Sequence, residues 1–195
     1  DLKTVTVSGL SISGTDAGNY SLANTSATTT ANVTAKALTA TFTASNKVYD
    51  GTTAATVAGA SSDIITGDTV TFNKTSSTFA DKNVGNGKTV SVAGISLAGT
   101  DGANYALANT TATTTANITP KSLTASFTAS NKVYDGNTTA TVTASSAQLV
   151  AQDVVTIANT GATFSDKNAG TGKTVSVAGV SISGADAGNY SLANL

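Results

Sequence analysis

Two Asp residues that could act as acids or metal ligands lie in the same short motif. Asp50 stands between Tyr49 and Gly51, and the same Tyr-Asp-Gly triplet returns at Asp135. An Asp before Gly is also typical of a turn, in which the carboxylate accepts a hydrogen bond from the following backbone and Gly admits a positive φ. We predict the turn role for both residues.

The chain lacks the side chains on which most catalysis depends. Its 195 residues include no His and no Cys, and every acidic residue is an Asp. General acid–base chemistry relies most often on His, with Glu and Asp next. We therefore expect no enzyme activity, no catalytic residue and no cofactor.

Calcium is the metal that acidic turns could bind. Calcium requires six to eight oxygen ligands from clustered carboxylates and carbonyls. The sequence has no closely spaced run of Asp, and Asp63 is replaced by Gln148 in the next copy of the surrounding pattern. We expect no metal ligand, and calcium at a repeat junction stays the alternative.

Lysines raise the question of an isopeptide cross-link, which would compensate for the missing disulfides. The recurring lysines are Lys47 and Lys88, with copies at Lys132 and Lys173. Such a bond generally needs a buried acid beside the lysine, and this alternative stays open. We interpret Lys82 beside Asp81 as a solvated ion pair.

Tyrosines could form an aromatic platform for a sugar. Tyr49 and Tyr105 recur as Tyr134 and Tyr190. Tyrosines of β-sandwich domains also pack in the core, with the hydroxyl reaching the backbone at a sheet corner. We predict this core role and keep glycan binding as the alternative.

A repeat of 85 residues positions all of these side chains. The segment 42–51 returns unchanged as 127–136, and the same offset carries the pattern that starts at Lys3 onto Lys88 and Lys173. The sequence is therefore a tandem array. We predict the C-terminal part of one repeat at 1–35, a complete repeat at 36–120, and a second repeat at 121–195 that lacks its last strand.

Alternation of apolar residues with Thr predicts short strands, for example at 38–42 and 112–118. We also predict a hairpin over 64–72 and a bulge or bend at Ala93–Gly94, where the apolar phase slips. The expected fold is all-β, with tandem Ig-like β-sandwich repeats arranged end to end. The expected core comprises Leu38, Phe42, Val70, Phe79, Val90, Val92, Leu97, Tyr105 and Leu107.

The net charge and the hydropathy of the sequence limit the kinds of partner that the chain could bind. The formal net charge is -1, so the chain has no basic surface for phosphates or anionic lipid. Its apolar runs are shorter than the ~18 residues of a membrane span. We expect neither nucleic acid nor a membrane as partner.

Four motifs occur in the same order in the repeat. They are Lys47-Val-Tyr-Asp-Gly-Thr-Thr, Phe79-Ala-Asp-Lys-Asn-Val-Gly-Asn-Gly-Lys-Thr-Val, Gly99-Thr-Asp-Gly-Ala-Asn-Tyr-Ala-Leu and Thr115-Ala-Asn-Ile-Thr-Pro-Lys. With these motifs the chain resembles the YDG-type repeats of large bacterial surface and exported adhesins, including filamentous-haemagglutinin-like exoproteins. The resemblance implies an extracellular structural repeat with no catalytic residues.

We therefore expect a structural repeat array, the stalk or fibre shaft of a bacterial surface adhesin or filament, on the cell surface or in a secreted fibre. The alternative is an adhesive module that binds glycan or a host surface. The expected partners are neighbouring repeats, which Pro120 joins without a flexible linker. Head-to-tail self-association through an open sheet edge near Leu192 is a second expectation, and glycan or host contact elsewhere in the full protein is a third.

Overall fold

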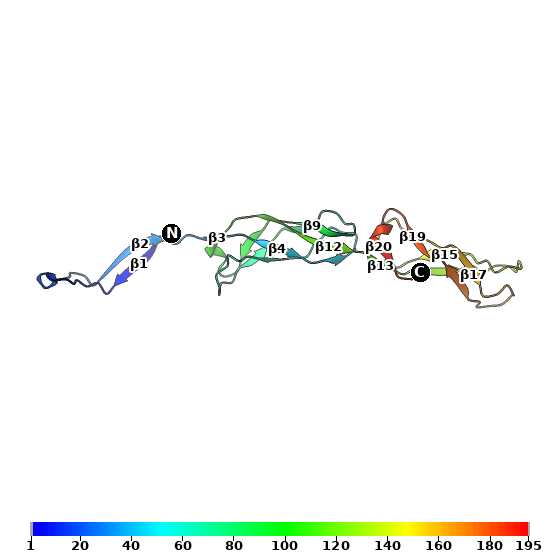
Figure 1. Ribbon diagram of the computed structural model, residues 1–195, viewed down its shortest axis with the longest axis horizontal. Helices are drawn as coiled ribbons and strands as arrows, with labels where there is room; N and C mark the ends of the chain where they lie inside the picture. Colours follow the sequence, from blue (N-terminus) through cyan, green and yellow to red (C-terminus); the bar gives the residue numbers. More distant parts are fainter. Residues whose placement is uncertain (1, 195) are drawn as a thin grey trace.

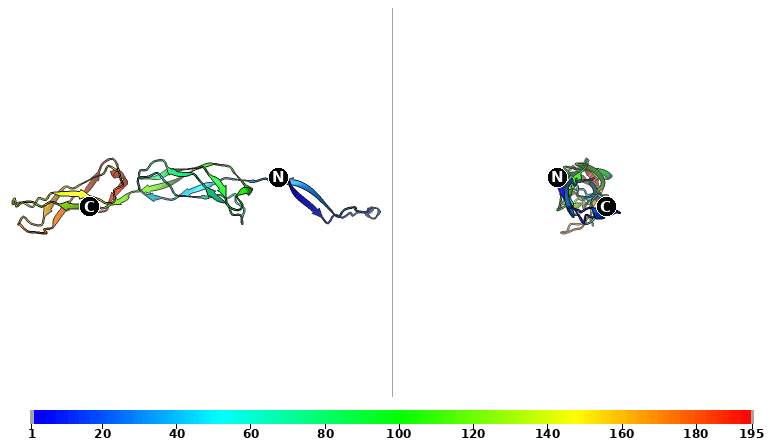
Figure 2. Two further views of the ribbon diagram at one scale, coloured as in Figure 1. Left: turned by 180° about the vertical axis from the view of Figure 1, so that it is seen from behind. Right: turned by 90° about the vertical axis from the view of Figure 1, so that its left-hand side faces the viewer.

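The computed structural model describes residues 2–194, which form a narrow rod (Figure 1). A hairpin, the unit 36–120 and the unit from residue 121 onward follow one another in chain order along one axis. Seen along that axis, the three segments lie behind one another (Figure 2). The repeats are thus arranged end to end.

The first segment is a two-stranded antiparallel hairpin of β1 (Leu2–Ser8) and β2 (Ser26–Asn32), with a 3-10 turn at Ala17–Asn19 between them. Val5 and Val7 on β1 are exposed, whereas their counterparts Val90 and Val92 in the next repeat are buried. The difference arises because the middle repeat has further strands that cover this face.

The middle unit contains ten strands and one 3-10 turn. They are β3 (Lys36–Leu38), β4 (Thr41–Ala44), β5 (Lys47–Val48), β6 (Val57–Ala60), β7 (Thr71–Asn73), β8 (Ser76–Phe79), β9 (Gly85–Ala93), β10 (Ser96–Ala98), the turn Gly102–Asn104, β11 (Tyr105–Leu107) and β12 (Thr111–Thr119). One four-stranded sheet has the order β5-β12-β9-β8, and the remaining strands pair as β4–β6, β7–β10 and β3–β11.

The core of this unit lies between the four-stranded sheet and the two-stranded β4–β6 sheet. Phe42 on β4 packs in one buried cluster with Val92 and Ile95, and its ring meets that of Phe72 edge-on at 6.1 Å. The predicted core residues are buried at Leu38, Phe42, Phe79, Val90, Val92 and Tyr105 and half-buried at Val70, Leu97 and Leu107. Strand alternation therefore identified the interior correctly.

The all-β prediction is confirmed, since three short 3-10 turns are the helical elements of residues 2–194. The Ig-like arrangement is not confirmed. An Ig sandwich is made of two antiparallel sheets. In this structure β3–β11 and β5–β12 are parallel pairs, and apart from the four-stranded sheet the strands form separate two-stranded sheets. No helix in these residues is long and apolar enough to cross a membrane.

The predicted bend at Gly94 is confirmed. Gly94 has a φ of +64°, β9 ends just before it, and β10 pairs with β7 instead of continuing in the β9 sheet. A Cβ at this position would lie 2.2 Å from Thr75 Oγ1, so the close approach requires glycine.

The predicted hairpin over 64–72 is wrong. Residues 64 and 65 lie in a turn region, where the backbone N–H of Ile65 donates to the Tyr105 hydroxyl at 2.9 Å. The other half of the expected hairpin, β7, pairs with the distant β10. A side-chain hydrogen bond thus replaces the local strand pair.

The following unit repeats this plan with a shorter counterpart of β9 and, among the described residues, without counterparts of β5 and β12. Its elements are β13 (Lys121–Leu123), β14 (Ser126–Ala129), β15 (Val142–Ser145), β16 (Thr156–Ala158), β17 (Gly161–Phe164), β18 (Val175–Ala178), β19 (Ser181–Ser183), the 3-10 turn Ala187–Asn189 and β20 (Tyr190–Leu192). The pairs are β13–β20, β14–β15, β16–β19 and β17–β18.

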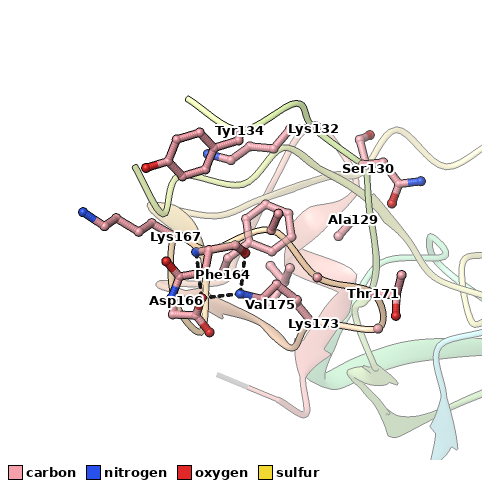
Figure 3. A pocket seen from close by; sticks show the side chains of 15 residues that line it. Ala129, Ser130, Lys132, Tyr134, Phe164, Asp166, Lys167, Thr171, Lys173 and Val175 are labelled. Carbon is pink, nitrogen blue, oxygen red and sulfur yellow. Dashed lines mark hydrogen bonds and ion pairs between the residues drawn. The ribbon is translucent and has the colours of Figure 1, made fainter. Parts of the chain in front are cut away.

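A hollow of about 580 Å3 lies in this unit beside Lys132, Phe164 and Lys173 (Figure 3). The corresponding space of the middle unit holds the end of β12, where Ile118 is buried and pairs with Gly85. The hollow thus has the position that β12 fills in the middle unit.

Candidate inter-repeat interface

A single residue, Pro120, separates the last strand of one unit from the first strand of the next. On one side, the Thr119 carbonyl accepts a hydrogen bond from the Tyr49 backbone N–H at 2.9 Å. On the other, Lys121 is in register with Tyr190 in the β13–β20 pair. Strand pairing therefore fixes both flanks of the junction, and no flexible linker lies between them.

The buried carboxylate of Asp153 joins the two units. The Tyr49 hydroxyl of the first unit lies 3.0 and 2.9 Å from its two oxygens, and the Tyr190 hydroxyl donates to Oδ2 at 2.6 Å. Lys82 Nζ, also from the first unit, lies 3.2 Å from Oδ1. With a side chain only 2% exposed, Asp153 is a buried acid whose partners come from both units.

Lys82 carries the positive charge of this interface. Its Nζ is also 3.3 Å from Asp186 Oδ1 and lies over the Tyr49 ring at 5.9 Å. The predicted solvated pair with Asp81 is wrong, because Asp81 instead binds Lys88 Nζ at 2.6 Å. Sequence adjacency suggested the wrong partner, because Asp81 and Lys82 lie in a bend in which the Asp81 carboxylate accepts from the Asn83 N–H and from Lys88, whereas Lys82 reaches the next unit.

The protonation states favour the network at neutral pH. Burial by itself would raise the pKa of Asp153, but hydrogen bonds from Tyr190, Tyr49 and Lys82 outweigh burial and lower it. Burial and the hydrogen bond to Asp153 raise the pKa of Tyr190 to about 12. Hydrogen bonds to Tyr49 and the two carboxylates raise the pKa of Lys82. At neutral pH, Asp153 and Lys82 are therefore charged and both tyrosines are neutral.

A second polar contact lies beside the first. The side-chain oxygen of Asn189 accepts a hydrogen bond from the Val84 backbone N–H at 2.9 Å, and its amide nitrogen lies 3.3 Å from Asn83 Oδ1. Asn189 is buried, with 5% of the residue exposed. Its burial is accommodated because both ends of its amide have partners in the preceding unit.

Apolar packing completes the interface. The rings of Tyr49 and Tyr190 meet edge-on at 5.6 Å, and both belong to one buried cluster that also includes Leu123 of the second unit and Val90 of the first. At Gly51, which has a φ of +78°, a Cβ would lie 2.7 Å from Val150 Cγ1. The hydrophobic core therefore continues through the junction.

The turn role predicted for the Asp of the Tyr-Asp-Gly triplet is confirmed. Asp50 Oδ1 accepts from the Thr52 backbone N–H at 2.9 Å and from Lys47 Nζ at 2.7 Å. Asp135 does the same with Asn137 at 3.1 Å and Lys132 at 2.8 Å. The carboxylate thus shapes the turn that carries the tyrosine.

The core role predicted for the tyrosines is confirmed for Tyr105 and Tyr190, which are buried and whose hydroxyls accept from backbone N–H groups of Ile65 and Val150. The prediction is incomplete for Tyr49, because its hydroxyl reaches the next unit. It is wrong for Tyr134, which is 60% exposed.

The recurring lysines bind exposed acids. The partners of Lys47 and Lys88 are Asp50 and Asp81, whose side chains are 52% and 53% exposed, so neither lysine has the buried acid that an isopeptide bond needs. Across residues 2–194, no group of three or more Asp, Glu, His or Cys side chains is arranged to hold a metal ion.

Sequence reasoning did not identify the contact of Tyr49 and Lys82 with Asp153. The available signal was the recurrence of acidic residues: Asp153 repeats Asp68 and Asp186 repeats Asp101 at the 85-residue offset, whereas the half-buried Asp63 does not recur. The recurrence is not specific to the junction, because the exposed Asp50 and Asp81 also recur, as Asp135 and Asp166.

The interface can also be compared with known proteins. Neither the comparison with curated proteins nor the comparison with solved structures gives a match. The family described as YDG domain matches twice, over residues 34–115 and 119–195, and the two matches meet at the junction. Because the matches cover most of the sequence, the chain belongs to the YDG domain family.

Proposed function

We propose that this chain is a segment of an extracellular stalk or fibre shaft of a bacterial surface adhesin or filament, which projects a tip away from the cell. The observation that carries the proposal is the continuous buried cluster through the junction, which contains Tyr49, Leu123 and Tyr190. A shaft requires units that keep their direction, and a junction with a shared core and one connecting residue provides this.

The polar contacts of the interface support the same function. Asp153, Asp186 and Asn189 of one unit contact Tyr49, Lys82 and Val84 of the preceding unit. Directional hydrogen bonds restrict rotation about the axis, which hydrophobic contact alone would permit. Repetition of such a junction yields a stiff array.

Within a unit, we propose that the two layers form a curled sandwich, with the two-stranded β4–β6 sheet over the four-stranded sheet. Both layers contribute to the cluster that contains Phe42 and Val92. The parallel pairs at the margins distinguish it from an Ig domain.

Neighbouring repeats are the proposed partners, in the same molecule or head to tail in another. At the outer ends, Ile65 is 55% exposed and Tyr134 is 60% exposed. These residues are the counterparts of Val150 and Tyr49, which both take part in the apolar packing at the junction. The hollow of Figure 3 is a second surface that a strand of suitable pattern could fill.

Antibodies against residues 36–120 test the proposed location and role on intact cells that produce the full protein. We expect labelling without permeabilisation, and we expect deletion of one repeat to bring a tag at the tip closer to the envelope by roughly 30–40 Å, the length of strands of nine to twelve residues.

Labelling only after permeabilisation contradicts the extracellular location. A tip that does not move after the deletion, combined with glycan binding by the isolated segment, favours the adhesive-module alternative. The burial of Tyr49, Tyr105 and Tyr190 in the present chain argues against an aromatic glycan platform at these positions.

A further inference from the structure

The first strand of the middle unit, β3, is held by β11, the strand that precedes the last strand of the unit. β3 pairs in parallel with β11, in the register Lys36 with Tyr105 through Leu38 with Leu107. The chain then passes from β11 into β12, which leaves the unit at its opposite end (Figure 1). A pull on the two ends of the unit therefore slides β3 and β11 past each other.

A side chain prolongs this parallel ladder. The Ala108 backbone N–H donates to the Leu38 carbonyl at 2.8 Å. Beyond it, Asn109 Oδ1 accepts from the Ala40 N–H at 2.8 Å, and Asn109 Nδ2 donates to the Ala40 carbonyl at 3.0 Å. The amide of Asn109 thus pairs with the backbone of Ala40 as a strand residue would.

The second unit has the same side-chain pair. Asn194 Oδ1 accepts from the Ala125 N–H at 2.9 Å, and Asn194 Nδ2 donates to the Ala125 carbonyl at 2.9 Å. Asn109 and Asn194 are separated by one repeat length. The arrangement is therefore a feature of the repeat and not of one copy.

The last strand is held along its whole length. β12 pairs antiparallel with β9 at seven positions, from Thr111–Ala93 to Ile118–Gly85. Near its end, the Asn117 N–H donates to Asn46 Oδ1 at 2.7 Å, and β5 adds a short parallel pair.

Hydrogen bonds between strands lie across the strand direction. When the two strands are pulled in opposite senses along their axes, all bonds of the ladder bear the force together, whereas pulling strands apart sideways breaks the bonds one after another. Both terminal strands of the unit lie along the long axis of the rod (Figure 1), so axial tension loads them in the first way.

We infer that each repeat is built to bear tension as a shear clamp, with Asn109 and Asn194 as side-chain rungs that retain the first strand. The inference rests on the proposed shaft function and adds to it, because a stiff rod that only separates a tip from a cell needs no resistance to axial pulling.

Single-molecule force spectroscopy on the full chain tests the clamp, and the absence of native Cys allows site-specific handles. Handles at Ala35→Cys and Pro120→Cys load the unit along its axis. Handles at Asn86→Cys and Pro120→Cys load the ends of β9 and β12 at the same end of the unit, because Gly85 pairs with Ile118. We expect a several-fold higher rupture force with the axial pair.

Asn109→Ala tests the rung in the axial geometry. Loss of two hydrogen bonds to Ala40 should raise the rate of unfolding under axial load by about tenfold, with no comparable effect in the sideways geometry. Asn73→Ala, on the exposed end of β7, is the matched control and should leave both rates unchanged. Circular dichroism verifies that each variant is folded.

Equal rupture forces in the two geometries, or an Asn109→Ala rate equal to that of Asn73→Ala, overturn the clamp. Either result leaves the shaft proposal standing if deletion of a repeat still moves the tip. If the tip does not move but the axial force is high, the clamp is correct and the shaft proposal is wrong.

Discussion

Replacement of Tyr49 by Ala is expected to lower the free energy of unfolding by about 3–5 kcal/mol, as for other large-to-small changes in a core. The Tyr49 side chain is 1% exposed, packs against Tyr190 and lies within hydrogen-bond distance of the Asp153 carboxylate. The change removes contacts of both units at once. Urea unfolding followed by far-ultraviolet circular dichroism measures the loss.

The repeat supplies the control for this experiment. Tyr134 occupies the same position of the same ten-residue motif but is 60% exposed, so Tyr134→Ala should change the free energy of unfolding by less than about 0.5 kcal/mol. Equal losses in the two variants would show that Tyr49 stabilises its own turn and not the junction.

The second large loss of stability is expected when the buried Asp153 is replaced. Asp153→Ala removes the acceptor of Tyr49, Tyr190 and Lys82 and should cost about 2–4 kcal/mol, because it leaves buried hydroxyls without their charged partner. The cost is below that of a fully buried ion pair, since the Lys82 side chain is 40% exposed and regains water.

The matched variant is Asp68→Ala, one repeat earlier. Asp68 accepts a hydrogen bond from Tyr105 at 2.6 Å in the same way that Asp153 does from Tyr190, but it has no inter-repeat partner among the described residues. Its loss should therefore be smaller than that of Asp153→Ala. A larger or equal loss at Asp68 would contradict an inter-repeat role for this acid.

The pH dependence gives an independent check of the Asp153 variant. The pKa of Asp153 is lower in the folded chain than its ordinary value of 3.8, so the stability from its ionised form is present above about pH 4 and is lost as the pH falls through the folded pKa. The wild-type chain should lose this stability in acid, and Asp153→Ala should lose correspondingly less.

At alkaline pH, the stability is expected to fall as the pH rises, opposite to its behaviour in acid. The pKa of Tyr190 rises from 10.0 to about 12 on folding, so its contribution is present below pH 10 and is lost as the pH rises toward 12. A chain whose stability is unchanged between pH 10 and 12 would indicate that Tyr190 is not held against Asp153.

The sequence predicted those parts of the structure that depend on local pattern. Alternation at 38–42 located the buried Leu38 and Phe42, and the phase slip at Gly94 located the bend. Both signals are local because a strand alternates with period two and a glycine admits positive φ.

The remaining parts depend on contacts between residues far apart in the sequence. The pairing of β3 with β11 and of β7 with β10 is not encoded in any short motif, and the hairpin expected over 64–72 failed for this reason. The junction was missed because Tyr49 and Tyr134 have identical sequence neighbours but opposite environments. Tyr49 lies against β12 of its own unit and against the next unit, and among the described residues Tyr134 has neither neighbour.

Small-angle scattering of the 195-residue chain tests most directly whether the shared core of the junction holds the units in line. A compact globule of this length has a radius of gyration of about 16 Å. The structure predicts at least about twice that value, with a distance distribution typical of a rod (Figure 2). A radius of gyration near 16 Å, from units folded back on each other, would contradict the account.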